Sequence, residues 1–216
     1  MIKNKKIKIL FLGPPGSGKG TIADLVSEKL KYVTISTGDL FRKTKDQTDP
    51  LSIEIQKIMN SGILISDEIT NKLAEKAIKE TIENDVGLIL DGYPRTVNQA
   101  EYLKNIINVD LVVSFIIDNS VLIKRIVGRQ NCLKCKKSFN KFFMPTIKED
   151  ICDYCQSSLS SRLDDKEDVV AARISEYNKN TAPLLEYYEK VIFEINAENS
   201  VHSIVKEILE KINEFN

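Results

Sequence analysis

The chain has 216 residues and carries 31 Lys and Arg against 31 Asp and Glu, so its formal net charge is zero. This balance excludes a global basic field that would draw the chain onto nucleic acid or anionic lipid, and no apolar run approaches the ~18 residues of a membrane span. Hydrophobic residues make up 42% of the chain, enough for one large domain or for a core with a small insertion.

The start of the chain lacks the pattern of a secretory signal. Residues 1–6 pass directly into alternating Lys and Ile, without an apolar core of roughly 7–15 residues and without a small-residue cleavage site. We therefore expect a soluble cytoplasmic protein that binds no membrane.

Strand and helix patterns alternate along most of the chain. In the first half we predict a strand at 7–12, a helix at 19–30, a strand at 33–36, a helix at 40–45, and helices through 49–84 with a break near 60–62. In the second half we predict strands at 87–90, 111–117 and 191–195, and helices at 119–129, 167–188 and 201–212. This alternation is typical of an α/β fold with a doubly wound parallel sheet of about five strands flanked by helices.

Three segments carry further detail. The strand at 111–117 is apolar except at Ser114, as in strands buried on both faces. Ser66 precedes an acidic pair and predicts the capped start of a helix. Residues 130–161 are rich in Cys, Lys, Ser and Phe and have little helical periodicity, which sets this segment apart from the rest.

A glycine-rich loop lies between the first predicted strand and helix. Residues 13–21 read Gly-Pro-Pro-Gly-Ser-Gly-Lys-Gly-Thr, in the setting that a phosphate-binding loop requires. The glycines let backbone N–H groups curl around phosphate oxygens, and the helix N-terminus adds positive potential. Lys19 supplies a mobile charge for the outer phosphates. The loop departs from the general pattern because Gly20 follows Lys19 and displaces the hydroxyl of Thr21 by one position.

This loop and a series of later motifs resemble those of the adenylate kinase family, in the same order. The later motifs are Ser36-Thr-Gly-Asp-Leu-Phe-Arg42, Asp91-Gly-Tyr-Pro-Arg-Thr96, Gln99, Arg125-Ile-Val-Gly-Arg129, and Arg162-x-Asp-Asp165 with Arg173. The resemblance covers roughly residues 7–213. It implies a P-loop NTPase-type fold, a monomer, and reversible conversion of MgATP and AMP to two ADP.

The resemblance also implies a division into lobes. The core kinase domain comprises residues 1–35, 66–127 and 166–216. Residues 36–65 form an AMP-binding lobe, and residues 128–165 form a LID, the lobe that closes over ATP and keeps water out.

The resemblance assigns site residues one by one. By this resemblance, the residues that bind the ATP phosphates are Gly16, Ser17, Gly18, Lys19, Gly20 and Thr21, and further ATP contacts come from Arg129, Ser138, Phe139 and Asn199. The residues implied to bind AMP are Thr37, Arg42, Ile63, Leu64, Ile65, Gly92, Tyr93, Pro94, Arg95, Gln99, Arg162 and Arg173. The catalytic set is Lys19, Arg95, Arg129, Arg162 and Arg173, and Asp91 is expected to hold Mg²⁺ through water.

These residue types suit phosphoryl transfer. The transition state spreads charge over equatorial oxygens and needs positioning more than covalent help. The arginines supply planar forks that match phosphate, and Lys19 supplies a point charge. One departure concerns the ATP adenine: where the family commonly has Gly before the last helix, this chain reads Asn196-Ala-Glu-Asn199.

All four cysteines lie in the proposed LID, as two C-x-x-C pairs separated by 16 residues: Cys132, Cys135, Cys152 and Cys155. A reducing cytosol disfavours disulfides, and this spacing is typical of four thiolates around one Zn²⁺. Because no fourth position stays open for water, the metal is expected to be structural. It would supply a cross-link that a lobe with little apolar core needs.

Two alternatives remain open at this point. The chain could be another nucleoside monophosphate kinase, acting on UMP, CMP or GMP, although Thr37, Gln99 and the long LID match the adenylate pattern. More remotely, the lysines and phenylalanines around the cysteines could form a zinc-ribbon nucleic-acid module. The neutral charge and the complete nucleotide site argue against nucleic acid as a partner.

Overall fold

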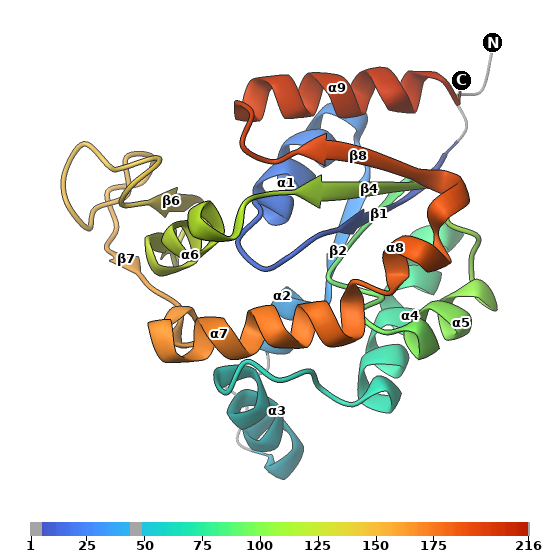
Figure 1. Ribbon diagram of the computed structural model, residues 1–216, viewed down its shortest axis with the longest axis horizontal. Coiled ribbons are helices and arrows are strands. Elements are labelled where there is room, and N and C mark those ends of the chain that lie inside the picture. The colour runs from blue at the N-terminus through green and yellow to red at the C-terminus, as the bar shows by residue number, and fades with distance from the viewer. Residues whose placement is uncertain (1–5, 44–48, 216) are drawn as a thin grey trace.

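The computed structural model describes residues 6–43 and 49–215, arranged around a five-stranded parallel sheet (Figure 1). Its strands are β1 (Lys8–Leu12), β2 (Val33–Ser36), β3 (Leu88–Asp91), β4 (Leu111–Ile116) and β8 (Ile192–Asn196), in the order β2-β3-β1-β4-β8. Every neighbouring pair runs parallel. The predicted α/β class, with a parallel sheet of about five strands, is confirmed.

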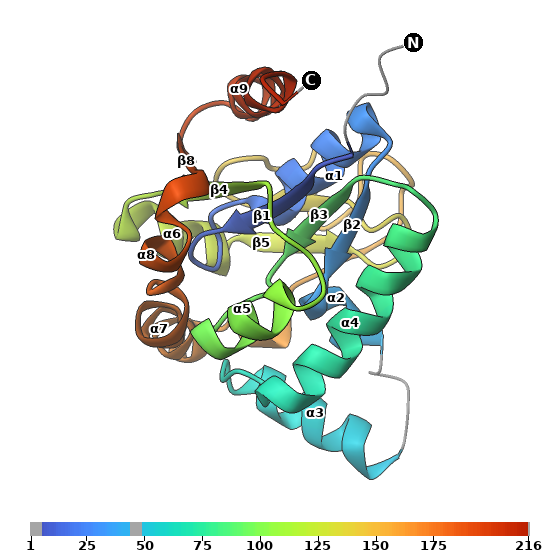
Figure 2. The same cartoon turned by 90° about the vertical axis from the view of Figure 1, so that its right-hand side faces the viewer.

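Helices cover both faces of this sheet (Figures 1 and 2). On one face lie α1 (Lys19–Leu30) and α9 (Val201–Asn213), and on the other lie α4 (Asp67–Glu83), α5 (Val97–Lys104) and α8 (Leu184–Tyr187). This is the doubly wound arrangement, in which both faces of each central strand are buried.

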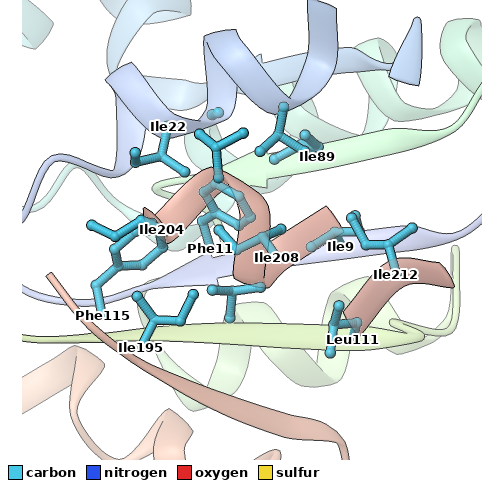
Figure 3. Close-up of a cluster of buried hydrophobic side chains, with 14 of the residues drawn as sticks. Ile9, Phe11, Ile22, Ile89, Leu111, Phe115, Ile195, Ile204, Ile208 and Ile212 are labelled. Atoms are coloured by element: carbon cyan, nitrogen blue, oxygen red, sulfur yellow. The ribbon is translucent and has the colours of Figure 1, made fainter. Parts of the chain in front are cut away.

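The strand β1 illustrates how the sequence divides the core. Ile9 and Phe11 point to the α1 and α9 side, where Figure 3 shows them packed against Ile208 and its neighbours. Leu10 and Leu12 join the cluster on the opposite face. Since successive side chains of a strand point to opposite faces, a continuous apolar run fills two cores at once.

Two smaller structures extend from the sheet's carboxyl edge (Figure 1). One is an antiparallel sheet that follows α6 (Asn119–Val127) and consists of β5 (Arg129–Cys132), β6 (Ser138–Asn140) and β7 (Leu159–Ser160). This is the segment that lacked helical periodicity in the sequence.

The other contains α2 (Thr37–Arg42) and α3 (Pro50–Asn60), packed around a small cluster of Phe41, Ile55 and Ile65. It projects away from the β5–β7 sheet, at the bottom of Figure 1. Among the described residues, the structure contains no helix that combines the length and apolarity needed to cross a membrane.

Three predicted elements differ from the structure. The helix predicted at 167–188 is divided into α7 (Glu167–Glu176), a π-type turn (Tyr177–Thr181) and α8. Pro183 explains part of this break, since its ring lacks an N–H and clashes with the carbonyl of the preceding turn. The hydroxyl of Thr181 also bonds outward, to the carbonyl oxygen of Arg95 at 2.9 Å.

The helix predicted at 40–45 begins earlier, because Ser36 caps α2 by accepting a hydrogen bond from the Asp39 N–H. Positions 44 and 45 lie outside the described residues. Ser66 does stand at the start of α4, but its side chain makes no capping hydrogen bond. The predicted position is confirmed and the predicted cap is not.

Candidate active site

The register of the sheet brings three chain segments together. Asp91, the last residue of β3, is level with Phe11 in β1 and with Ser36 in β2. The glycine-rich loop, the start of α2 and residues 92–96 therefore all leave the sheet at the same edge. In open parallel sheets the crevice outside the carboxyl ends of the strands is where ligands bind.

Glycine is required at two positions of the loop for different reasons. Gly18 stands at the N-cap of α1 with φ of 93°, a left-handed conformation that other residues rarely adopt. At Gly16 a side chain would also meet its neighbours, because an added Cβ would lie 2.5 Å from Cγ1 of Ile126. The loop is thus held against α6 as well as against its own helix.

Lys19 reaches back across this loop. Its Nζ donates to the carbonyl oxygens of Gly13 at 2.7 Å and Pro14 at 2.9 Å, and to Oγ of Ser17 at 3.3 Å. Burial lowers the pKa of Lys19 to about 8; Asp91 opposes this shift and nearby arginines add to it. The ammonium therefore occupies a site where positive charge is concentrated and incompletely balanced.

The segment after β3 is tied to the start of α2. The hydroxyl of Thr37, which is buried, donates to the carbonyl oxygen of Gly92 at 2.7 Å. Nε of Arg95 donates to the same carbonyl at 2.8 Å, and burial lowers the pKa of Arg95. Tyr93 is fully buried and its hydroxyl donates to Asn71 at 2.7 Å, which leaves only its backbone near the crevice.

Asp165 holds two of the predicted catalytic arginines. Its carboxylate, almost fully buried, accepts a bidentate pair from Arg129, with Nε at 2.7 Å from Oδ2, and also accepts from Arg173 at 2.7 Å. Asp164 binds Arg173 as well, at 3.0 Å. Burial disfavours the Arg129 cation, but the hydrogen bonds and charge of Asp165, together with the charges of Asp164 and Asp91, outweigh burial and raise the pKa of Arg129.

Arg42 and Arg162 lie in contrasting environments. Arg42 forms a two-point contact with Oδ1 of Asp39, through Nη2 at 2.6 Å and Nε at 3.1 Å. No carboxylate among the described residues lies within ion-pair distance of Arg162. Burial, together with Arg129 and Arg42, lowers the pKa of Arg162 to about 9. Asp165 and Asp164 oppose this shift from beyond ion-pair distance, so a phosphate could provide the direct anionic partner that no described residue supplies.

Gln99 is buried, with 1% of its surface exposed. Its Oε1 accepts from the backbone N–H of Arg95 at 2.7 Å, and its Nε2 donates to Asp67 at 2.7 Å. Asp67 follows the predicted adenine-lining segment 63–65, in which Ile63 is exposed and Ile65 is buried. The amide, which belongs to α5, thus joins the first residue of α4 to the segment that follows β3.

The predicted ATP-base contacts lie in two places. Phe139 is 4% exposed and packs among the cysteines, so its ring belongs to the core of the 128–165 segment. Ser138 beside it donates to Oδ1 of Asn131 at 2.8 Å. Asn199 lies in the turn before α9, where its N–H donates to the carbonyl of Asn196 at 3.2 Å. The roles of these residues toward ATP stay predictions.

The four cysteines converge on one point. All four Sγ atoms lie within 4.8 Å of one another, with Cys132 and Cys155 at 3.3 Å and Cys135 and Cys152 at 3.5 Å. Thiolates bound tetrahedrally at ~2.3 Å from Zn²⁺ would stand roughly 3.8 Å apart, so the cluster fits such an ion. The spacing is too long for disulfides, whose S–S bonds are ~2.05 Å.

Each cysteine pair lies in its own backbone turn, and the two turns have the same conformation. The N–H of Lys136 bonds the carbonyl of Cys132, and the N–H of Gln156 bonds that of Cys152, each at 2.9 Å. Lys136 and Gln156 both have positive φ, 63° and 58°. Two equivalent turns present their sulfurs to a shared point, as a four-thiolate metal site needs.

Arg125 is a residue to which the sequence assigned no separate role. Its Nη1 donates to the carbonyl oxygen of Ser17 in the glycine-rich loop at 3.4 Å, and its guanidinium lies 5.5 Å from the ring of Phe143. Its only sequence signal was membership of the 125–129 motif. The contact with the loop depends on how α6 packs, which the sequence does not state.

Comparison with known proteins identifies the family to which this chain belongs. The family model for adenylate kinase matches residues 11–193. An adenylate kinase of Borrelia turicatae is 42% identical over 211 residues, covering 97% of this chain and 100% of the relative. One of Mesomycoplasma hyopneumoniae is 43% identical over 96% of this chain and 98% of the relative, and one of Treponema denticola is 45% identical over 84% and 86%. With matches of this extent, the chain belongs to the adenylate kinase family.

Proposed function

We propose that this chain catalyses the reversible transfer of the terminal phosphoryl group of MgATP to AMP, forming two ADP. The observation that carries the proposal is the convergence of Lys19, Arg95, Arg129, Arg162 and Arg173 with Asp91 beside the glycine-rich loop. Membership of the family and the names of the relatives agree with it. Both favour this activity over UMP/CMP phosphorylation and over nucleic-acid binding.

The residues divide the work between the two nucleotides. The N–H groups of residues 16–21 and the Lys19 ammonium hold the phosphates of ATP. Thr37, Arg42, Arg95 and Gln99 hold AMP, with the backbone of residues 63–65 and 92–94 beside its base. The transferring phosphoryl group gives Arg162 an anionic partner at ion-pair distance, which the described protein residues do not provide.

Asp91 is the residue suited to hold Mg²⁺. It ends a buried strand, and its Oδ2 is 3.5 Å from the Cβ position that a side chain at Gly20 would occupy, so the carboxylate faces the phosphate loop. A single carboxylate beside phosphate oxygens is the usual protein contribution to Mg²⁺, which keeps several waters. When bound, the ion neutralises charge on the phosphates.

We assign the four cysteines to a structural Zn²⁺ and residues 128–165 to a LID. The core comprises 1–35, 66–127 and 166–216, and residues 36–65 form the AMP-binding lobe. Because Arg129 and Arg162 lie near the two ends of the LID and Asp165 anchors Arg129, we expect LID movement and arginine placement to be coupled. A closed LID excludes water and protects ATP from hydrolysis. We further propose a cytoplasmic monomer that binds no nucleic acid.

A coupled assay with MgATP and each of AMP, UMP, CMP and GMP tests the proposal. AMP should be the preferred acceptor, and the reverse reaction should yield ATP and AMP from ADP. Faster phosphorylation of UMP or CMP would contradict the substrate assignment. Salt-dependent retention on a nucleic-acid column would favour the zinc-ribbon alternative.

A further inference from the structure

A closed ring of hydrogen bonds surrounds Gln99 and leads to a residue outside the sites assigned above. The Gln99 Oε1 accepts from the Arg95 N–H, and its Nε2 donates to Oδ1 of Asp67, both at 2.7 Å. The other oxygen of Asp67 accepts from the Thr96 hydroxyl at 3.0 Å. That hydroxyl accepts in turn from the backbone N–H of Gln99 at 3.1 Å.

The two partners of the amide fix which way it faces. A backbone N–H can only donate and a carboxylate can only accept. The oxygen of Gln99 must therefore lie toward Arg95 and the nitrogen toward Asp67, and a flipped amide would set donor against donor and acceptor against acceptor. The positions of the Gln99 amide oxygen and nitrogen therefore follow from the donor and acceptor chemistry of their neighbours.

After these bonds the amide keeps one N–H donor and one oxygen lone pair for a ligand. The six-membered edge of adenine offers an amino donor and a ring-nitrogen acceptor. Hypoxanthine offers the reverse, a carbonyl acceptor and a ring N–H donor. A Gln99 amide of fixed polarity therefore pairs donor with acceptor on the adenine edge, and on the hypoxanthine edge it sets donor against donor and acceptor against acceptor.

Asp67 differs in this respect from its neighbour in the same helical turn. Glu68 is exposed and its carboxylate contacts Lys72, one turn along α4, at 2.8 Å. Either residue can stabilise the positive N-terminus of α4. Of these two residues, only Asp67 accepts hydrogen bonds at both carboxylate oxygens from another element. The donors are Thr96 and Gln99 at the start of α5, 29 and 32 positions away in sequence.

We propose that Asp67 is a positioning residue that sets the base selectivity of the acceptor site by fixing the polarity of the Gln99 amide. This rests on the proposed function, because it concerns the base of the nucleoside monophosphate that accepts the phosphoryl group. Asp67 does not itself touch the substrate. Thr96 supports it by holding the second carboxylate oxygen.

The test compares AMP with IMP, which differ in the polarity of this edge. With MgATP as donor, Asp67→Ala should lower the ratio of kcat/KM for AMP to that for IMP about tenfold, through the KM for AMP. Asp67→Asn keeps one carbonyl oxygen but adds a donor, and it should lower the ratio about threefold. The KM for ATP and kcat at saturating AMP should stay within twofold of wild type.

Glu68→Ala is the matched control, since it removes a carboxylate from the same turn and should leave the ratio unchanged. If Asp67→Ala fails to fold, the nearly isosteric Asp67→Asn carries the test. An unchanged AMP to IMP ratio in a folded Asp67 variant, or equal losses for AMP, IMP and ATP, would overturn this inference alone. Wild-type protein that prefers UMP or CMP to AMP would overturn the proposed function and this inference with it.

Discussion

The central sheet and the LID are held together by different forces. Both faces of the sheet bury clusters of aliphatic and aromatic side chains, including Ile89 on one face and Leu90 on the other, that lose nearly all contact with water. The buried hydrophobic cluster of the LID consists of Phe139 and two of its four cysteines. Apolar LID residues such as Ile147, 95% exposed, lie outside that cluster.

This difference has a consequence for the chemistry. Burial of apolar surface keeps the phosphate loop and Asp91 in place whether or not a metal is bound. On our assignment, the LID instead depends on ligation by its four cysteines, since metal binding would supply folding energy to a lobe with so small a core. We therefore expect the phosphate-loop side of the site and the proposed LID to respond differently to substitution, metal removal and pH.

The largest effect should come from the core side of the site. Lys19→Met removes the charge beside the outer phosphates and should lower kcat roughly 100- to 1,000-fold, as for other preorganised electrostatic groups. Thermal stability and metal content should be retained. Lys29→Met, on the exposed side of the same helix, is the control. Near-normal turnover in Lys19→Met would remove this residue from the catalytic set.

Truncation in the core tests the first half of the comparison. Ile89 is fully buried in the middle of β3, so Ile89→Ala should lower the free energy of unfolding by about 3 kcal/mol through lost burial and a residual cavity. Ile116→Ala, at a position 47% exposed, should cost much less. Denaturant melts of both variants measure this, and the folded fraction should keep its metal. Equal costs at the two positions would contradict the packing described here.

Removal of one cysteine tests the second half. Wild-type protein should contain one Zn²⁺ per chain, and Cys152→Ser should lose it and expose LID backbone amides to hydrogen exchange while β1, β3 and β4 stay protected. Some activity should survive at low temperature, because Lys19, Arg42 and Arg95 lie outside the LID. Ile147→Ser serves as a LID control.

Two results would break this part of the comparison. Complete loss of turnover in Cys152→Ser, with the core still protected, would indicate a catalytic metal. Metal-free protein after purification under reducing, chelator-free conditions would remove zinc from the account.

Gln99→Ala should affect one nucleotide more than the other. Loss of a buried hydrogen-bonding group beside the base should raise the KM for AMP about tenfold and leave the KM for ATP nearly unchanged. Asn98→Ala, at an exposed neighbouring position in α5, controls for the helix. Equal increases in both KM values would mean that Gln99 acts only through stability.

The smallest effect concerns pH. With its pKa near 8, Lys19 should lose its proton in the free protein, so kcat/KM for ATP should fall above pH 8. Bound phosphate favours the cation, so kcat should hold to higher pH. The folded pKa lies below the ordinary 10.5, so this group opposes folding fully below pH 8 and less as pH rises toward 10.5. A flat kcat/KM profile from pH 7 to 9 would show that Lys19 stays charged without nucleotide.

Much of the site could be predicted because its signals are local. The glycine-rich loop needs glycine where the backbone is left-handed, as at Gly18, and the cysteine pairs need one tight turn each. Strand and helix periods likewise depend on near neighbours. The glycine-rich loop, the cysteine turns and the strands and helices each depend on a run of a few residues. The structure contains them close to the predicted positions.

The partners of the polar side chains were decided only by the tertiary structure. In the sequence Asp67 is an acidic residue at a helix start, and Arg125 is one member of a motif; in the fold one orients Gln99 and the other contacts Ser17. The break in the predicted 167–188 helix likewise includes a bond from Thr181 to Arg95, 86 positions away. Such contacts depend on how strands and helices pack, and a bond between distant residues leaves no periodic trace in either segment.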